Sequence, residues 1–251
     1  GQFSKHEKKI RQILKECDYY SCECQRDVCI AKNYGLKGKV LPVLPNSGGF
    51  NFKKIKRYYR KNKPSKRRLI LLKGYQGLFG RAFVGLRALE RCADLLKGYK
   101  VIIFATYKDS DVSFAAKIFT NRTGIPTESL SWISHAEILK LQNKARIYIG
   151  LSISDAISTS LLESMVMGSF PIQSNTSCAD EWIENNKTGM IVPAEDPEII
   201  TDAIRKALTD DVLVDRAADL NWQFAQDYLD EEILKKKTID FYLEASGKKK
   251  K

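Results

Sequence analysis

Apolar and polar residues alternate in blocks that predict a repeated strand and helix order from residue 67 onward. Short, continuous apolar runs at residues 69–72, 101–105 and 146–151 are typical of strands buried on both faces of a parallel sheet. Residues 190–193 predict the last strand. The apolar spacing favours helices at residues 81–96, 111–123, 134–143, 160–167, 198–208, 210–229 and 231–244. The pattern therefore predicts the α/β class, with a Rossmann-like parallel sheet that carries helices on both faces.

Residue types at the helix ends support these boundaries. Ser134 and Glu137 have the spacing of a capping box, in which each side chain bonds the other residue's backbone N–H. Asp196 followed by Pro197 supplies an N-cap and a first-turn proline. His135 lies directly after the first of these caps. It is therefore interpreted as a first-turn helix residue, with a catalytic role as the alternative.

The first 64 residues do not have the pattern of a complete domain. A basic helix at 3–16, a short strand at 18–21, a helix at 26–34 and a strand at 39–46 are predicted. That last strand ends in a Pro-Asn turn at Asn46. Residues 51–66, rich in Lys and Arg, are predicted to form a linker, and the four lysines at 248–251 a frayed, solvated tail.

Composition narrows the classes of partner. The 251 residues carry 42 basic and 30 acidic side chains, a net charge of +12, and 43% of them are hydrophobic. A basic chain suits anionic partners, which include nucleic acid, phosphorylated sugars and membrane surfaces. No run of about 18 apolar residues predicts a membrane span, and no secretory signal is recognised. We expect a cytoplasmic protein, with a peripheral position at the inner face of a membrane as the alternative.

Cysteine spacing raises the question of a metal site. Cys17, Cys22, Cys24 and Cys29 are symmetrically spaced, but paired zinc ligands more commonly have two residues between them. If the segment is extended, Cys22 and Cys24 point to opposite faces. Free thiols in a reducing compartment are therefore favoured over zinc, and no metal site is predicted.

Two acids stand out between residues 152 and 184. Asp155 lies in the loop after the strand at 146–151, and Glu163 lies eight positions on, in the otherwise apolar helix at 160–167. Burying an unpaired charge costs several kcal/mol or shifts its pKa. Glu163 therefore either points outward to solvent or meets a hydroxyl-rich or basic partner.

A glycine-rich stretch joins the first strand to the first helix. Gly74, Gly77 and Gly80 let the backbone approach a ligand, and a helix N-terminus favours anions such as a diphosphate. Arg81 adds a forked cation. The glycines do not match the dinucleotide fingerprint, so a nicotinamide site is not expected; a surface turn is the alternative. Both this turn and the Asp155 loop follow the carboxyl ends of parallel strands, where open α/β sheets bind ligands.

These residues resemble a known family. Asp155, seven residues, then Glu163 followed by Ser-Met-x-x-Gly-x-x-Pro-Ile, and later Glu181-Trp182-Ile183, are similar to the donor-site signature of family 4 (group 1) glycosyltransferases with the GT-B fold. That family usually has Glu where Asp155 stands. The resemblance covers residues 67–229 and, less closely, 18–46. It implies a remnant of an N-terminal domain with a linker at 1–64, a donor-binding domain at 65–229, and a C-terminal helix with the lysine tail at 230–251.

The resemblance implies roles for particular residues. Asp155 would orient the donor sugar, Glu163 would hold the ribose hydroxyls and Arg81 would bind the diphosphate. Asp155 and Arg81 are the implied catalytic residues. Lys73 or Gln76 replaces a second cation of the family. The implied donor-binding set is Gly74, Tyr75, Gln76, Gly80, Arg81, Trp132, Ile133, Asp155, Ala156, Ile157, Ser158, Thr159, Glu163 and Glu181.

The implied activity is retaining transfer of a sugar from a nucleotide-diphosphate donor, with UDP or GDP, to a glycan, lipid or other acceptor, as in polysaccharide biosynthesis. The acceptor would bind mainly to the missing N-terminal domain, so the activity of the whole enzyme and that of this chain alone are separate expectations. No cofactor is expected. Asp109 and Asp111 have the spacing of a metal-binding Asp-x-Asp pair but precede a helix and are interpreted as its cap, so metal independence is predicted.

Three alternatives come from other classes. A non-catalytic sugar-nucleotide binding module would share the site and is the nearest rival. A nucleic-acid binder would use the positive charge, but no basic motif with interleaved aromatic residues supports it, and no nucleic-acid partner is predicted. A sugar-nucleotide epimerase of the GT-B fold would need acid and base residues, and the two histidines are not well placed for that chemistry.

Overall fold

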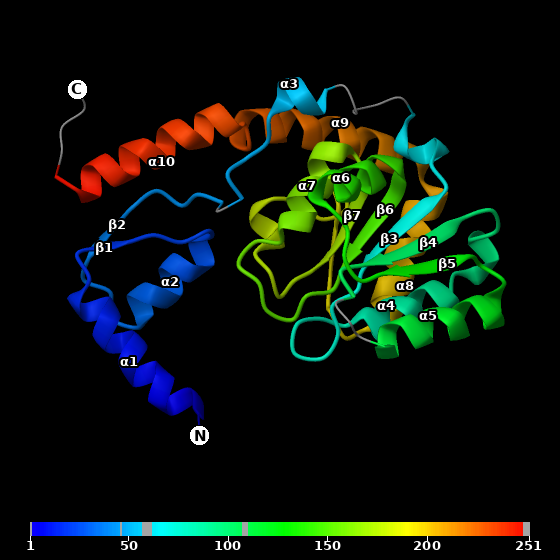
Figure 1. Cartoon of the computed structure of the whole chain (residues 1–251), viewed down its shortest axis with the longest axis horizontal. Coiled ribbons are helices and arrows are strands. Elements are labelled where there is room, and N and C mark those ends of the chain that lie inside the picture. Colours follow the sequence, from blue (N-terminus) through cyan, green and yellow to red (C-terminus); the bar gives the residue numbers. More distant parts are fainter. Residues whose placement is uncertain (1, 46, 57–61, 107–109, 248–251) are drawn as a thin grey trace. The chain divides into compact units, whose positions relative to one another are not determined.

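A computed structural model describes residues 2–45, 47–56, 62–106 and 110–247 of the chain (Figure 1). They form two compact units: residues 52–227, and residues 1–51 together with 228–251. Asn46 of the predicted turn, Asp109 of the predicted helix cap and the tail at 248–251 lie outside the described residues. Each unit is considered by itself.

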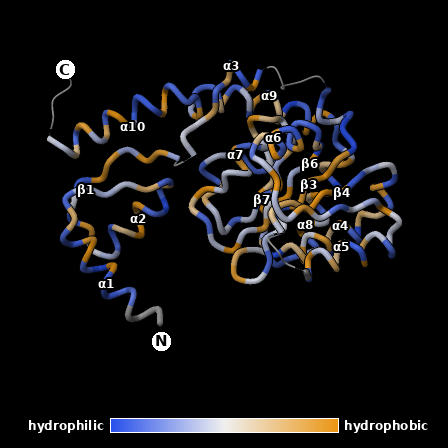
Figure 2. Tube along the Cα trace, in the orientation of Figure 1, coloured by the Kyte–Doolittle hydropathy of each residue, from blue (hydrophilic) through white to orange (hydrophobic). Residues whose placement is uncertain are grey.

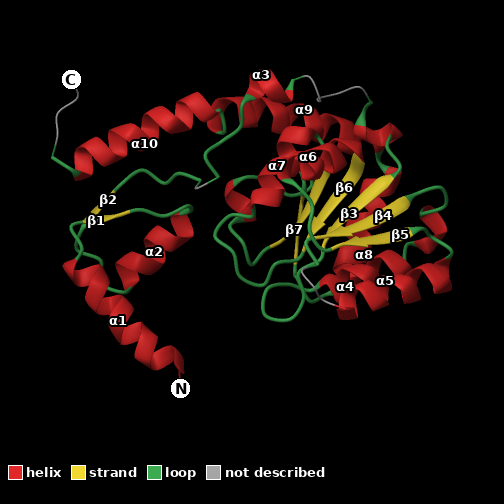
Figure 3. Cartoon of the chain, in the orientation of Figure 1, coloured by secondary structure: helices red, strands yellow, loops and turns green. Residues whose placement is uncertain are grey.

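A six-stranded sheet forms the centre of the larger unit (Figure 3). All its strands are parallel, in the order β5-β4-β3-β6-β7-β8. Their bounds are β3 Leu69–Lys73, β4 Lys100–Phe104, β5 Thr127–Leu130, β6 Ala145–Gly150, β7 Phe170–Ser174 and β8 Met190–Val192. The predicted parallel sheet is confirmed. The strand at Phe170–Ser174 completes it.

Helices cover both faces of this sheet. In Figure 1, α6 and α7 lie on one face, and α4, α5 and α8 on the other. The bounds are α3 Phe52–Ile55, α4 Ala82–Glu90, α5 Ser110–Thr123, α6 His135–Lys144, α7 Thr159–Met167, α8 Pro197–Thr209 and α9 Asp211–Tyr228, with short 3-10 helices η1 Pro64–Lys66, η2 Ala93–Leu95 and η3 Ala179–Glu181. This is the predicted Rossmann-like fold. Among the described residues, every helix is too short or too polar to cross a bilayer.

The core is built from the apolar runs of the strands. Residues of β3, β4 and β6 are buried on both faces of the sheet, as continuous apolar runs require (Figure 2). The helix α7 is equally enclosed: every residue from 160 to 167 is buried, Glu163 included. Burial at this scale is the main favourable term in folding, and it places one carboxylate inside the core layer.

Most helix boundaries follow the sequence signals. Ser134 and Glu137 form the capping box, and Asp196 accepts hydrogen bonds at the start of α8. Gly168 ends α7 with φ of +75°, a conformation that favours glycine. One boundary was predicted wrongly: the helix expected at 81–96 ends at Glu90. A turn and η2 follow, and no glycine or proline marks the break, so it depends on tertiary packing rather than on local sequence.

The smaller unit joins the two ends of the chain. It contains α1 Gln2–Glu16, β1 Tyr19–Tyr20, α2 Gln25–Asn33, β2 Lys39–Val40 and α10 Glu231–Ala245. The strands β1 and β2 pair in parallel. Lys39 forms an ion pair with Glu244 of α10, and the Phe50 N–H donates to the Leu229 carbonyl (2.7 Å). The sequence analysis predicts residues 230–251 to be a separate segment, whereas α10 belongs to the same compact unit as the N-terminal elements.

Two further expectations concern this unit. The strand expected at 39–46 is regular only over its first two residues. Among the described residues, no three of the cysteines Cys17, Cys22, Cys24 and Cys29 bring their sulfur atoms within the range of one metal ion. In the described part of the chain, none of the four forms a disulfide.

A buried arginine holds the amino end of the sheet together. Arg146 of β6 is 1% exposed. Its guanidinium donates to the carbonyls of Ala207 (2.9 Å) and Leu208 (3.0 Å) in α8 and of Ser65 in η1 (2.7 Å). It also pairs with Asp211 at 2.7 Å. One side chain therefore bonds carbonyls at the ends of two segments, and the Ser65 carbonyl also accepts from Arg68 (3.0 Å).

Replacing Arg146 with methionine is expected to lower the free energy of unfolding by about 2–4 kcal/mol, because it leaves buried carbonyls unpaired. The midpoint of urea unfolding measures the effect. Arg205→Met is the matched control, since Arg205 pairs with Asp94 at the surface. An equal shift in both variants would show that the buried contacts of Arg146 carry no special weight.

Candidate functional site

The candidate site lies where the chain connections of the sheet diverge. From β3 the chain runs outward through β4 to β5, and from β6 it runs the other way through β7 to β8. Neighbouring strands whose connections leave in opposite directions produce a crevice at their carboxyl ends, where open α/β sheets bind ligands. Lys73 ends β3, and Ser152 follows β6 by two residues.

A cavity of about 330 Å³ occupies this crevice. Its walls come from the end of β3, the glycine turn, the loop after β6 and the first turn of α7. The lining residues are Lys73, Tyr75, Phe79, Ser152, Ser154, Asp155, Ile157, Thr159 and Ser160. The two stretches predicted from the sequence therefore meet at one cavity.

Lys73 is the cation of this cavity. Its side chain is 8% exposed, and its Nζ lies 3.4 Å from Ser158 Oγ and 4.3 Å from the centre of the Tyr75 ring. Burial lowers the pKa of Lys73, while Asp155 and Glu163 act in the opposite direction. Neither acid, nor any other carboxylate of the described residues, forms an ion pair with it. A buried cation without an acid partner is a candidate for binding an anion.

The glycine turn is fastened to the loop after β6. Gly80 and Ser152 form an antiparallel bridge, the Arg81 N–H donates to the Leu151 carbonyl (3.0 Å), and the Ile153 N–H to the Phe79 carbonyl (3.2 Å). A Cβ at Gly80 would lie 2.6 Å from the Tyr75 carbonyl oxygen, so a side chain does not fit there without a shift. The glycine is therefore required where the turn folds back closely on Tyr75.

Arg81 lies outside the cavity lining. Its guanidinium pairs with Glu195 (2.6 Å) and donates to the Gly77 carbonyl (2.6 Å). It therefore braces the turn. Gln76, the other residue weighed with Lys73, accepts a hydrogen bond from the Phe83 N–H (3.1 Å) through its side-chain oxygen. Gly74 packs so closely on Thr106 that a Cβ would meet its methyl group at 2.6 Å.

Hydrogen bonds from the end of β7 and from the segment after it hold the loop that contains Asp155. The Ser152 carbonyl accepts from Ser174 Oγ (2.7 Å), and the Ala156 carbonyl accepts from the Cys178 N–H (3.0 Å). Ser158, the N-cap of α7, is buried and contacts Lys73 rather than capping the helix with its side chain. The N-terminal turn of α7, with its partial positive charge, therefore faces the same cavity as Lys73.

Glu163 lies one turn further along α7 from Ser160. It is 3% exposed, and its Oε1 lies 2.9 Å from Nε2 of His135. Its Oε2 is buried and has no hydrogen-bond partner among the described residues. This contact raises the pKa of His135. The basic partner that the sequence pattern left open is thus an exposed histidine that was expected only to begin a helix.

Buried polar side chains support the cavity floor. Tyr148 of β6 is fully buried, and its hydroxyl donates to Gln173 Oε1 (3.4 Å). Burial raises the pKa of Tyr148, so its phenol stays neutral. Nothing in the sequence spacing marked either residue, because both lie inside apolar strand runs.

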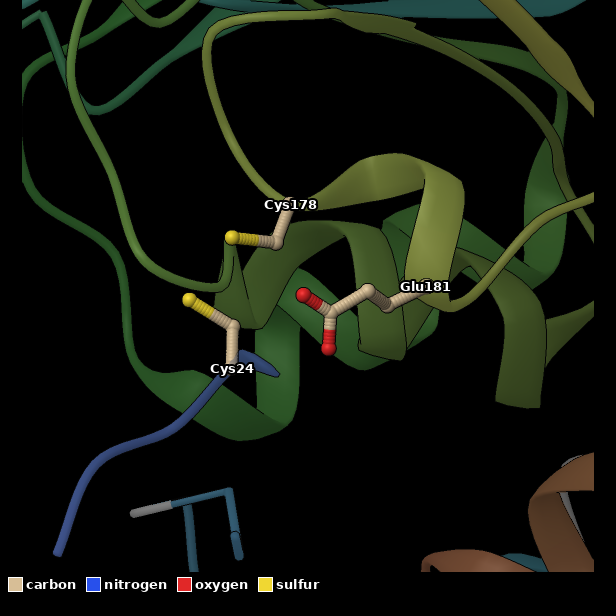
Figure 4. A group of neighbouring side chains, drawn as sticks. All are labelled: Cys24, Cys178 and Glu181. Atoms are coloured by element: carbon tan, nitrogen blue, oxygen red, sulfur yellow. The ribbon is translucent and has the colours of Figure 1, made fainter. Parts of the chain in front are cut away.

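Of the predicted donor-binding set, only Tyr75, Asp155, Ile157 and Thr159 line the cavity. Trp132, Ile133 and Glu181 lie on other segments. Trp132 is 83% exposed on the loop after β5, and Ile133 follows it. Glu181 ends η3, the segment that begins after Cys178 (Figure 4). It lines a different cavity, of about 340 Å³, beside α9. Their assignment to a donor stays a prediction.

Comparison with known proteins points to one class. Residues 125–222 match the family model described as Glycosyl transferases group 1. That range includes β6, the Asp155 loop and α7. No curated protein sequence matches the chain.

Solved structures share the fold. HepE of Anabaena, solved in complex with UDP-glucose, has a TM-score of 0.73 at 13% identity, with 94% of this chain and 68% of that chain covered. Sucrose-phosphate synthase of Thermosynechococcus elongatus has a TM-score of 0.73 at 16% identity, covering 97% and 62%. The C-terminal domain of LpcC, a group 1 glycosyl transferase of Francisella tularensis, has a TM-score of 0.62 at 15% identity, covering 72% and 99%.

These likenesses establish the fold as that of a GT-B glycosyltransferase, with a Rossmann-like sheet. The chain spans about two thirds of the length of the first two structures.

Replacing Glu163 with methionine is expected to leave the free energy of unfolding within about 1 kcal/mol of that of the unmodified chain, or to raise it, because a buried and half-partnered carboxylate stabilises the fold little. Gln142→Met is the control. Gln142 is fully buried, accepts from Ser169 Oγ (2.6 Å) and donates to the Ser160 carbonyl, so its loss should cost about 1–3 kcal/mol. The midpoint of urea unfolding of each variant measures the change in the free energy of unfolding. A large loss at Glu163 would mean that this carboxylate serves the fold rather than a ligand.

Proposed function

We propose that the chain is the donor-binding part of a retaining glycosyltransferase of family 4, which takes a sugar from a nucleotide-diphosphate sugar. The observation that carries the proposal is the buried amine of Lys73. It lines the cavity at the carboxyl ends of β3 and β6 and has no acid partner among the described residues. A cation kept in this state suits a ligand that brings its own negative charge. The match of residues 125–222 to group 1 glycosyl transferases supports the same class.

The chemistry follows from the charges around the cavity. Departure of the diphosphate builds negative charge on its oxygens, and fixed positive groups stabilise that charge most effectively when they need no reorganisation. Lys73 and the N-terminal turn of α7 supply them. Asp155 lines the same cavity and would bind hydroxyls of the donor sugar. Arg81, the predicted diphosphate ligand, would first have to leave Glu195, so we assign the diphosphate to Lys73.

Glu163 would bind the ribose. An ionised carboxylate accepts two hydrogen bonds from a vicinal diol, and such charge-assisted bonds are the stronger kind. Its unpartnered Oε2 provides one of the acceptors. Nucleotide identity would depend on groups that contact the base, for which Trp132 and Ile133 remain the predicted pair.

The acceptor is assigned to a different part of the enzyme. The chain spans 68% of HepE and 62% of sucrose-phosphate synthase, and residues 1–64 would be the end of an N-terminal domain that binds a glycan or a lipid-linked acceptor. A cytoplasmic location, peripheral to a membrane where the acceptor is a lipid, agrees with this assignment. The rival function, a sugar-nucleotide binding module without turnover, shares the cavity and differs only in transfer.

Calorimetric titration with UDP, GDP and ADP is expected to show binding of at least one nucleotide. Lys73→Met and Glu163→Ala should each weaken that binding at least tenfold, about 1.4 kcal/mol, because each removes one of the charged groups assigned to the ligand. Arg81→Ala, measured beside them, decides whether the diphosphate uses the predicted arginine as well.

Lys100→Met is the control for a general loss of positive charge. Lys100 begins β4, at the opposite end of the strands, and pairs with Glu128. It should leave the affinity unchanged. If no nucleotide binds, or if the affinity is unchanged in both Lys73→Met and Glu163→Ala, the donor site is wrongly placed.

Nucleotide binding is expected to need no divalent metal. Lys73 and the N-terminal turn of α7 line the cavity and supply the positive charge that a metal ion would otherwise bring to the diphosphate, and Asp155, the one acid among the described lining residues, is assigned to the sugar hydroxyls. Titrations with a chelator and with added magnesium should therefore give the same affinity. A clear dependence on magnesium would assign a metal role to Asp155 and contradict the charge scheme proposed above.

A further inference from the structure

The contact between His135 and Glu163 joins an exposed group to a buried one. The histidine side chain is 64% exposed and that of the glutamate 3%, with 2.9 Å between Nε2 and Oε1. Only one carboxylate oxygen is engaged, since Oε2 has no partner among the described residues. The histidine therefore contacts the carboxylate from the solvent side, and the buried Oε2 is left without a partner among the described residues.

Both ends of α6 are fixed, which fixes the position of the ring. At the start, Ser134 and Glu137 form the capping box directly around His135. Nearer the end, Gln142 donates to the Ser160 carbonyl of α7 and accepts from Ser169. The backbone of His135 is thus set against α7 by contacts that do not involve its own side chain.

The helix α6 and the three elements packed against it, α7, β3 and β6, each carry a titratable group that bears on the contact between His135 and Glu163. Glu163 of α7 is within hydrogen-bond distance. Lys73 of β3 and Tyr148 of β6 lie on the other elements packed against α6, and Glu163 interacts electrostatically with both. On α6 itself, Glu137 is occupied by Ser134. Protonation of His135 is therefore governed chiefly by Glu163.

Resting on the proposed donor site, we propose that His135 is the positioning residue for Glu163, and that nucleotide binding is coupled to its protonation. The imidazolium holds Oε1 and thereby turns Oε2 toward a ribose hydroxyl. It also balances the charge of a carboxylate that the bound nucleotide would enclose further. The neutral ring fulfils only part of this role, because it donates from Nε2 in one tautomer and supplies no charge.

The sign of the pH dependence follows from linkage. The hydrogen bond to Glu163 raises the pKa of His135 in the free protein. A bound nucleotide brings anionic phosphates near the ring and favours the imidazolium still more. Binding therefore takes up a proton, and affinity declines as the pH rises through the pKa of His135. The dependence disappears when residue 135 cannot titrate.

The test is calorimetric titration with UDP, or with GDP or ADP if one of these binds better, from about pH 6 to pH 8.5 around the usual histidine pKa. The unmodified chain, His135→Gln and His6→Gln are compared. His6→Gln replaces the only other histidine of the chain and should reproduce the unmodified profile. His135→Gln should bind several-fold more weakly at the acid end and converge with the unmodified chain at the alkaline end. Ionisation of the nucleotide itself affects all three proteins alike.

Proton NMR of the imidazole gives a readout that does not depend on activity. The signal that is absent in His135→Gln should titrate above the usual histidine range, move down in Glu163→Gln and move up when nucleotide is bound. If the chain binds nucleotide but His135→Gln keeps the same pH profile, the positioning role is overturned and the donor site stands. If the unmodified chain binds no nucleotide, the proposed function fails, and the role of His135 fails with it.

Discussion

The divergence of the chain between β3 and β6 is the constraint on which the rest of the structure depends. These two strands pair directly, yet their connections leave in opposite directions, which produces a crevice at their carboxyl ends. The residues of the candidate site are arranged around that gap. The glycine turn closes it from one side, the Asp155 loop from the other, and the bridge between Gly80 and Ser152 keeps the two at a fixed distance.

Lys73 at the gap, and Glu163 on the helix beside it, have fewer polar partners than Arg146, a cation buried elsewhere in the larger unit. Arg146 is a buried cation with a structural role, and three carbonyls and one carboxylate surround its guanidinium. Lys73 has a serine hydroxyl and an aromatic ring. The carboxylate of Glu163 is likewise only half engaged. Incomplete pairing of a cation that lines the cavity and of a carboxylate on the adjoining helix α7 is expected where a ligand supplies the missing partners.

Much of the fold could be predicted from the sequence because apolar runs, capping residues and glycines act over a few positions. The runs at 69–72 and 146–151 became β3 and β6, and Ser134 with Glu137 formed its box. The break after Glu90 could not be predicted, since it has no local signal. In the candidate site, the sequence could indicate that the glycine turn and the Asp155 loop meet at one edge of the sheet, but it could not indicate the direction of the side chains. Lys73 turned into the cavity and Arg81 turned out to Glu195. His135 and Glu163 are 28 positions apart, and no periodicity connects them.

Arg146 also has a consequence for the order in which the protein is made. Its guanidinium lies in β6, while two of the carbonyls that it binds lie at the end of α8, about 61 residues later in the chain. During translation the strand is available well before those partners leave the ribosome. Until they do, the guanidinium must keep its contact with water, because burying it unpaired would be costly. The base of the sheet therefore closes late in synthesis, only after the helix that completes it has emerged.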